Sequence, residues 1–97
     1  MEIFLRNFGT TLISRPSGNE AFKVFEPNLM KITNDETLTI DFDGVITFSP
    51  SWGDEFVTPL VKKYGDKLIL KNTENPSVKA SLRTLEDTNA VKMNIVS

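Results

Sequence analysis

The sequence predicts an α/β domain with a central mixed sheet of four to five strands and about three helices. Short apolar stretches alternate along the chain with longer stretches whose apolar residues recur at helical spacing. Strands that alternate with helices favour a sheet that is at least partly parallel. The 97 residues, of which 39% are hydrophobic and 25% charged, fit one globular domain, so we treat residues 1–97 as a single domain.

Two strands are expected at the start of the chain. Residues Ile3–Phe8 are rich in large apolar side chains and predict the first. Residues Thr10–Ser14 are rich in β-branched side chains and predict either its hairpin partner or its continuation.

The first helix is expected after Arg15-Pro16, which breaks the strand. Ser17 and Glu20 have the spacing of a capping box. The apolar residues that follow at helical spacing are Phe22, Phe25, Leu29 and Ile32. Pro27 falls inside this pattern and is expected to bend or divide the helix, and residues 34–36 form the next turn.

The middle of the chain predicts a strand at Thr37–Phe42, a further apolar stretch at Val45–Phe48, and a helix at Ser51–Tyr64. This helix carries two adjacent apolar stripes, which indicate a wide buried face. The stripes consist of Trp52, Phe56 and Leu60, and of Val57, Val61 and Tyr64. Pro59 interrupts the pattern without ending it.

The last third of the chain predicts a strand at Lys67–Lys71, a third helix capped by Asn75 with Pro76 at its first position, and a final strand at Val91–Val96. The residues expected in the core are Phe42, Phe56, Leu60, Leu70 and Leu82.

Composition excludes several classes of function. The chain has no cysteine and no histidine, so it lacks disulfides, thiolate metal sites and the commonest general base. The net charge of -2 and the scattered basic residues argue against nucleic-acid binding. No segment has the apolar length of a signal peptide or a membrane span. We therefore expect a cytoplasmic protein that uses no cofactor and no resident metal.

Two acids stand at the end of the predicted central strand. The segment Asp41–Ile46 resembles the first motif of the haloacid-dehalogenase phosphatases, which implies that Asp41 attacks phosphorus and Asp43 acts as acid or base. That chemistry also needs a later acidic pair for Mg²⁺. The late pair Glu86-Asp87 falls at the end of a predicted helix rather than on a strand, which argues against this enzyme. The simpler interpretation is that Asp41 and Asp43 face solvent or cap a turn in which Gly44 has a positive φ.

The segment from Ser49 to Glu55 leads into the helix and carries hydroxyls and acids together. Ser49 or Ser51 is expected to cap the helix, and Asp54 and Glu55 suit its first turn. Ser51 is also a candidate phosphoacceptor, although the two acids would repel an added phosphate. A Mg²⁺ or Ca²⁺ site is an alternative, with the ligands Asp41, Asp43, Asp54 and Glu55. Arg15 is either an anion ligand or an exposed side chain beside a turn.

Several short elements recur together in this chain. They are Phe8-Gly9, Ser14-Arg15 with Gly18, Ile40-Asp41-Phe42-x-Gly44-Val45, and Ser49-x-Ser51-Trp52-x-Asp54-Glu55. In this order and spacing they resemble the bacterial STAS-like domains of uncharacterised function. In the wider STAS superfamily, the anti-sigma-factor antagonists carry an Asp-Ser-Ser-Gly motif whose second serine is phosphorylated by a partner kinase. An ungapped match places Ser51 at the phosphorylated serine and Ser49, Pro50 and Trp52 at the other positions.

The resemblance implies a small STAS-like fold and a non-enzymatic protein-interaction module in bacterial or phage-borne regulation. The implied partner is an anti-sigma-like protein or a histidine-kinase-type ATPase. The expected contact residues are Ser49, Ser51, Trp52, Asp54, Glu55 and Phe56, with Ser51 as the switch. The alternatives are a small metal-binding or phosphatase-like domain that uses Asp41 and Asp43, and a structural homo-oligomer without a switch.

Overall fold

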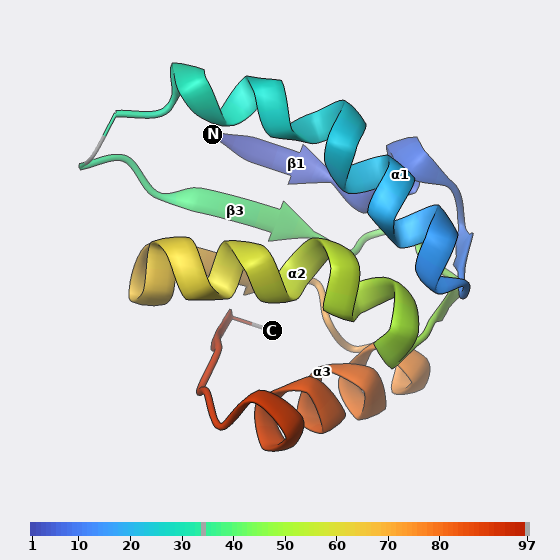
Figure 1. The fold of residues 1–97 in the computed structure, drawn as a ribbon. Helices are drawn as coiled ribbons and strands as arrows, with labels where there is room; N and C mark the ends of the chain where they lie inside the picture. Colours follow the sequence, from blue (N-terminus) through green and yellow to red (C-terminus); the bar gives the residue numbers. More distant parts are fainter. Residues whose placement is uncertain (34, 97) are drawn as a thin grey trace.

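The computed structural model describes residues 1–33 and 35–96, which form an α/β fold with two parallel sheets (Figure 1). The main sheet has four strands in the order β1 (Glu2–Phe4), β3 (Leu38–Asp41), β5 (Leu68–Lys71) and β6 (Asn94–Val96). A second sheet pairs β2 (Thr11–Leu12) with β4 (Thr47–Phe48). The expected α/β class and number of helices are confirmed.

The expectation of a mixed sheet is wrong, because every strand pair among the described residues is parallel. Each step from one strand of the main sheet to the next passes through one helix: α1 (Arg15–Phe25), then α2 (Pro50–Tyr64), then α3 (Pro76–Asn89). Because the strand order advances in one direction and such crossovers are right-handed, all three helices lie on one face of the sheet (Figure 1). The carboxyl ends of the strands and the start of each helix therefore lie at the same end of the molecule.

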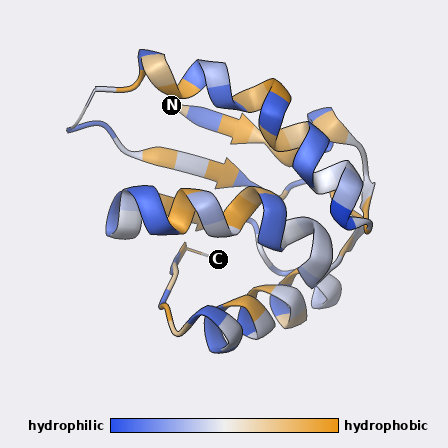
Figure 2. Cartoon of the chain, viewed as in Figure 1, coloured by the Kyte–Doolittle hydropathy of each residue, from blue (hydrophilic) through white to orange (hydrophobic). Residues whose placement is uncertain are grey.

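The core lies between this helix layer and the sheet. Ile3, Ile40 and Leu70 are aligned across three neighbouring strands and are all buried. Figure 2 shows hydrophobic residues on β1 and β3 and along the inner sides of the helices. The five predicted core residues are confirmed, with at most 2% of their surface exposed: Phe42, Phe56, Leu60, Leu70 and Leu82.

The first strand is shorter than predicted, and its expected hairpin does not form. After β1 the chain turns into the 3-10 helix η1 (Leu5–Phe8), which buries Leu5 and leaves Arg6 exposed. The strand β2 then pairs with β4 in parallel, with Leu12 opposite Phe48. This pairing joins segments far apart in the sequence, a relationship that local patterns do not encode.

Helix α1 begins at Arg15, earlier than the predicted Ser17. Ser14 is the N-cap, and its hydroxyl oxygen accepts a hydrogen bond from the Ser17 amide at 3.2 Å. Pro16 does not break the chain, because a proline in the first turn removes an N–H that has no helical partner there. Pro27 does divide the helix as predicted, since a 3-10 segment η2 (Glu26–Lys31) follows Phe25.

The remaining boundaries agree closely with the predictions. Helix α2 runs through Pro59, and α3 is capped by the Asn75 side chain, which accepts from the Ser77 and Val78 amides. A 3-10 turn η3 (Gly65–Lys67) precedes β5. Of the predicted turn at residues 34–36, Asn34 lies outside the described residues. The last strand begins at Asn94 rather than Val91.

No helix in the described part of the chain is long and apolar enough to cross a membrane.

Candidate functional site

The first turn of α2 lies where the two sheets and α1 meet. The Ser49 amide donates to the Leu12 carbonyl at 2.9 Å, so the strand β2 and the start of α2 are joined directly. Ser49 is the N-cap of α2, and its hydroxyl oxygen accepts from the Trp52 amide at 3.2 Å. The same hydroxyl donates to the Ile13 carbonyl. Ser49 is therefore fully occupied in holding the turn.

Ser51 differs from Ser49 in both exposure and bonding. It stands at the second position of α2, is exposed, and makes no side-chain hydrogen bond with the described residues. Of the two serines that the sequence offered as caps, Ser49 is the cap and Ser51 is the accessible hydroxyl. This geometry leaves Ser51 open to a modifying enzyme or a partner.

Trp52 and Phe56, which are expected to contact a partner, do not present their side chains at the surface. Both are fully buried, and their rings stack at a centroid distance of 5.1 Å. Phe48 packs edge-on against Trp52 at 5.9 Å. The two aromatic residues thus anchor α2 in the core, and the surface beside Ser51 is formed by other residues.

Asp54 and Glu55 are bound by a single arginine from α1. One guanidinium nitrogen of Arg15 lies 2.9 Å from an Asp54 carboxylate oxygen and 2.8 Å from a Glu55 carboxylate oxygen. The Asn19 side-chain amide donates to the other Glu55 oxygen at 3.0 Å. Arg15 is thus an ion-pair partner within the protein, and both acids are held in place by α1.

The charges in this cluster affect one another. The hydrogen bond from Arg15 lowers the pKa of the Asp54 carboxyl below its ordinary value. The hydrogen bonds to Asp54 and Glu55 raise the pKa of Arg15. One guanidinium and two carboxylates give this group a formal net charge of about -1. The repulsion that the sequence suggests between the acids and a phosphate on Ser51 is partly offset by Arg15.

Asp41 and Asp43 have separate structural environments. Asp41 is buried, and one of its carboxylate oxygens accepts from the Asp43 amide at 2.9 Å and from the Asn72 side-chain amide at 2.8 Å. Asp43 is exposed and pairs with Arg6 at 2.8 Å. Gly44 has a φ of 84°, as the turn interpretation predicts. The phosphatase-like alternative needs two carboxylates free to react, and here Asp41 caps the turn.

The four acids of the metal-site alternative do not gather around one point. Asp54 and Glu55 bind Arg15, whereas Asp41 and Asp43 belong to the turn after β3. Within residues 1–33 and 35–96, no group of three or more acidic, histidine or cysteine side chains is arranged to hold a metal ion. A chain with no histidine or cysteine would have to supply such a site from oxygen ligands.

Two residues of this surface, Asn19 and Ile13, are not among those expected from the sequence. Asn19 follows Arg15 by four residues, a spacing that places both on one side of α1, and this could have shown that they act together. Ile13 is half exposed, and its carbonyl is held by Ser49. An exposed apolar residue is thus joined through its backbone to the N-cap of α2.

Comparison with known proteins gives one match. No curated protein and no solved structure matches the chain. The model of the family described as STAS-like domain of unknown function (DUF4325) matches residues 18–78, which include most of α1, all of β3, β4, α2 and β5, and more than half of the chain. The expected resemblance is confirmed: this chain belongs to the STAS-like domain family.

Proposed function

We propose that the chain is a non-enzymatic protein-interaction module of the anti-sigma-antagonist type, switched by phosphorylation of Ser51. The observation that carries this proposal is that the two serines at the start of α2 differ in hydrogen bonding and in exposure. Ser49 is committed to capping, whereas Ser51 is exposed and without a hydrogen bond to the described residues. The partner is an anti-sigma-like protein or a histidine-kinase-type ATPase in the cytoplasm.

The surface around Ser51 suits a protein partner. It combines a half-exposed apolar residue, Ile13, with the charged group formed by Arg15, Asp54 and Glu55. Apolar contacts surrounded by charged groups are common in protein interfaces, where the charges set orientation and specificity. The buried Trp52, stacked on Phe56, anchors the first turn of α2 in the core beneath this surface.

Phosphorylation would change this surface more than it would change the fold. A phosphate adds roughly -1.5 to -2 charges at neutral pH. The positive end of the α2 dipole attracts that charge, and the net negative Arg15–Asp54–Glu55 group opposes it. These two effects act against each other within the domain. A partner that approaches Ser51 with an acidic or apolar surface would experience the full added charge.

The experiment is an affinity purification from the source cells with wild-type, Ser51→Ala and Ser51→Asp proteins, followed by mass spectrometry and calorimetry on the purified partner. We expect Ser51→Ala to bind about as well as wild type and Ser51→Asp to bind at least about tenfold more weakly, a difference of about 1.4 kcal/mol. The matched control is Ser17→Asp, because Ser17 is also an exposed serine in the first turn of a helix. Equal losses for Ser17→Asp and Ser51→Asp would argue against a switch at Ser51.

A further inference from the structure

The two edges of the main sheet are covered differently. Ile3, Ile40, Leu70 and Ile95 form one row across the four strands, on the side that faces the helices. At the β1 edge the row is covered, since Ile3 is only 7% exposed. At the β6 edge the row is not covered, because Ile95 is 41% exposed. The neighbouring Leu70 is still fully buried. An apolar residue of the inner row is thus left open to solvent at one edge.

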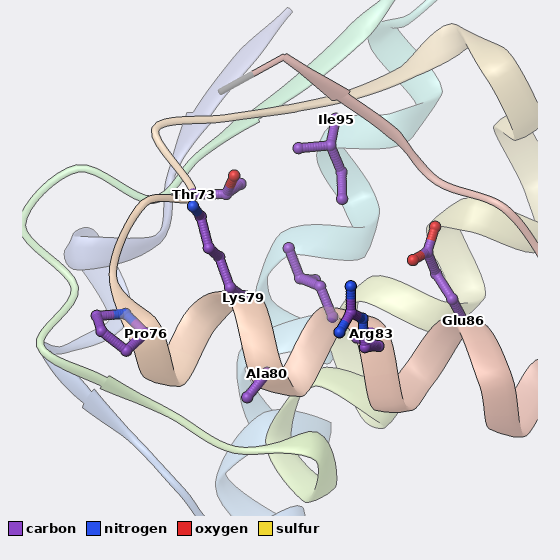
Figure 3. A pocket seen from close by; sticks show the side chains of 8 residues that line it. Thr73, Pro76, Lys79, Ala80, Arg83, Glu86 and Ile95 are labelled. Atoms are coloured by element: carbon purple, nitrogen blue, oxygen red, sulfur yellow. The ribbon is translucent and has the colours of Figure 1, made fainter.

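A groove of about 580 Å³ lies beside Ile95, between β6 and α3 (Figure 3). Its apolar lining includes Ala80 and Leu82 from α3. Ile95 enters it from the strand side, and Lys79 and Arg83 extend into it from the helix. The size lies within the range of ligand-binding clefts in proteins. None of the residues that line it belongs to the segment Ser49–Glu55.

The outer edge of β6 is available for hydrogen bonding. Among the described residues β6 pairs only with β5, so the backbone groups on its other side have no strand partner. Such an edge can accept an extended peptide as an additional strand, with affinity from the main chain and specificity from alternate side chains.

The charges in the groove favour an acidic occupant. Lys79 and Arg83 stand four residues apart on α3, and neither forms an ion pair with the described residues. Glu86 also lines the groove, and its carboxylate accepts a hydrogen bond from the Met93 amide at 2.8 Å. The groove therefore offers two cations that form no ion pair within the described chain and one acid beside an apolar floor, a formal net charge of about +1. A second copy of this chain, docked symmetrically along β6, would bring its own Lys79 and Arg83 towards these two.

We propose that this groove binds an extended acidic peptide of a partner protein, which adds to the main sheet as a strand beside β6. Its apolar side chains pack against Ile95 and the floor of the groove, and its acidic side chains pair with Lys79 and Arg83. This would be a second interaction surface, separate from Ser51, and it does not depend on phosphorylation.

The test begins with selection from a library of random octapeptides displayed on phage, and the enriched peptides are then synthesised with a fluorescent label. We expect enriched sequences in which Asp or Glu stands two residues from an apolar residue, because side chains two apart along a strand share the face that meets α3. The double variant Lys79→Glu/Arg83→Glu should bind them at least about tenfold more weakly. The control Lys23→Glu/Lys31→Glu makes the same charge change at exposed positions of α1 and η2 and should bind normally. Enrichment without acidic residues, or equal binding to both double variants, would overturn the proposal.

Strand addition is tested by methylating the peptide backbone. Alternate N–H groups of an added strand point towards β6 and the others point away. Methylating the peptide nitrogens that point towards β6 should therefore abolish binding, and methylating the other alternate set should leave the affinity unchanged. Equal effects of the two sets would exclude strand addition.

A second copy of the chain is the competing occupant. If the protein forms a dimer that Ile95→Asp dissociates, and no peptide binds, the edge belongs to a second copy and the proposal is overturned. Ser51→Asp should not change peptide affinity, so this test is independent of the proposed switch.

Discussion

Gly18 of α1 lies directly against the backbone of Trp52 in α2. A Cβ atom added at Gly18 would stand 2.5 Å from the Trp52 carbonyl oxygen and 3.0 Å from its Cα, which is closer than real side chains approach. The close approach of these helices brings Arg15 within reach of Asp54 and Glu55. The first turn of α2 is therefore positioned by a contact that only glycine allows.

Replacing Gly18 with alanine should destabilise the protein. Alanine improves helix propensity by about 1 kcal/mol, but the forced separation of packed backbones costs about 1–3 kcal/mol, so we expect a net loss of up to about 2 kcal/mol. Denaturant unfolding measures this. The neighbouring exposed Ser17→Ala is the control and should change stability by about 0.5 kcal/mol or less. A Gly18→Ala protein more stable than wild type would show that the two helices are not in such close contact.

The ion pairs of Arg15 should make stability depend on pH below neutrality. The pKa of Asp54 is lowered in the folded protein by the hydrogen bond from Arg15, so the unfolded chain binds a proton first as the pH falls. The stabilisation is present above the ordinary Asp pKa of about 3.9 and is lost as the pH falls through the folded pKa. Arg15→Gln should therefore lower the melting temperature at pH 7, and its difference from wild type should shrink as the pH falls below about 4. A constant difference across this range would contradict the assignment.

Asp41 and Asp43 should respond differently to mutation although they are two residues apart. Asp41→Ala leaves the Asp43 amide and the Asn72 side chain without their acceptor, which should cost about 1–3 kcal/mol of unfolding free energy. Asp43→Ala is the matched control, because it removes only an exposed pair with Arg6. The measurement is chemical denaturation of both variants. Equal losses would mean that Asp41 does not cap the turn.

The core face of α2 gives a prediction for Leu60. Its side chain is fully buried, so Leu60→Ala should cost about 2–5 kcal/mol in denaturant titration. Met30→Ala provides the comparison, because 90% of the Met30 surface is exposed and its removal should change little. A loss at Leu60 below about 1 kcal/mol would show that this face of α2 is not packed as described.

The elements that the sequence predicted well are those with strong local signals. Helix α2 was expected at Ser51–Tyr64 and runs from Pro50 to Tyr64, because its two apolar stripes and its capping serines are encoded within the segment itself. Local signals also located α3 through Asn75 and Pro76. In α1 the Ser17–Glu20 spacing predicts a cap at Ser17, whereas the cap is Ser14, because the local pattern does not reveal that Pro16 is accommodated in the first turn.

Relationships between distant segments were not predictable in the same way. The parallel pairing of β2 with β4 depends on how two short strands meet in three dimensions, and a two-residue strand carries no sign of its partner. The same holds for Arg15, whose bond to Asp54 spans helices that the sequence cannot place side by side. Trp52 carried a mixed signal, because an aromatic residue in a serine-rich turn suits both a binding surface and a core.

Calorimetry on the phosphorylated protein shows whether Ser51 switches partner binding. Protein carrying phosphoserine only at position 51 is compared with unmodified protein by calorimetry against the purified partner, with melting temperatures measured in parallel. We expect a loss of affinity of at least about tenfold, with little change in melting temperature. Unchanged affinity for the phosphorylated protein would contradict the switch and leave Ser51 as an ordinary exposed residue of the first turn of α2.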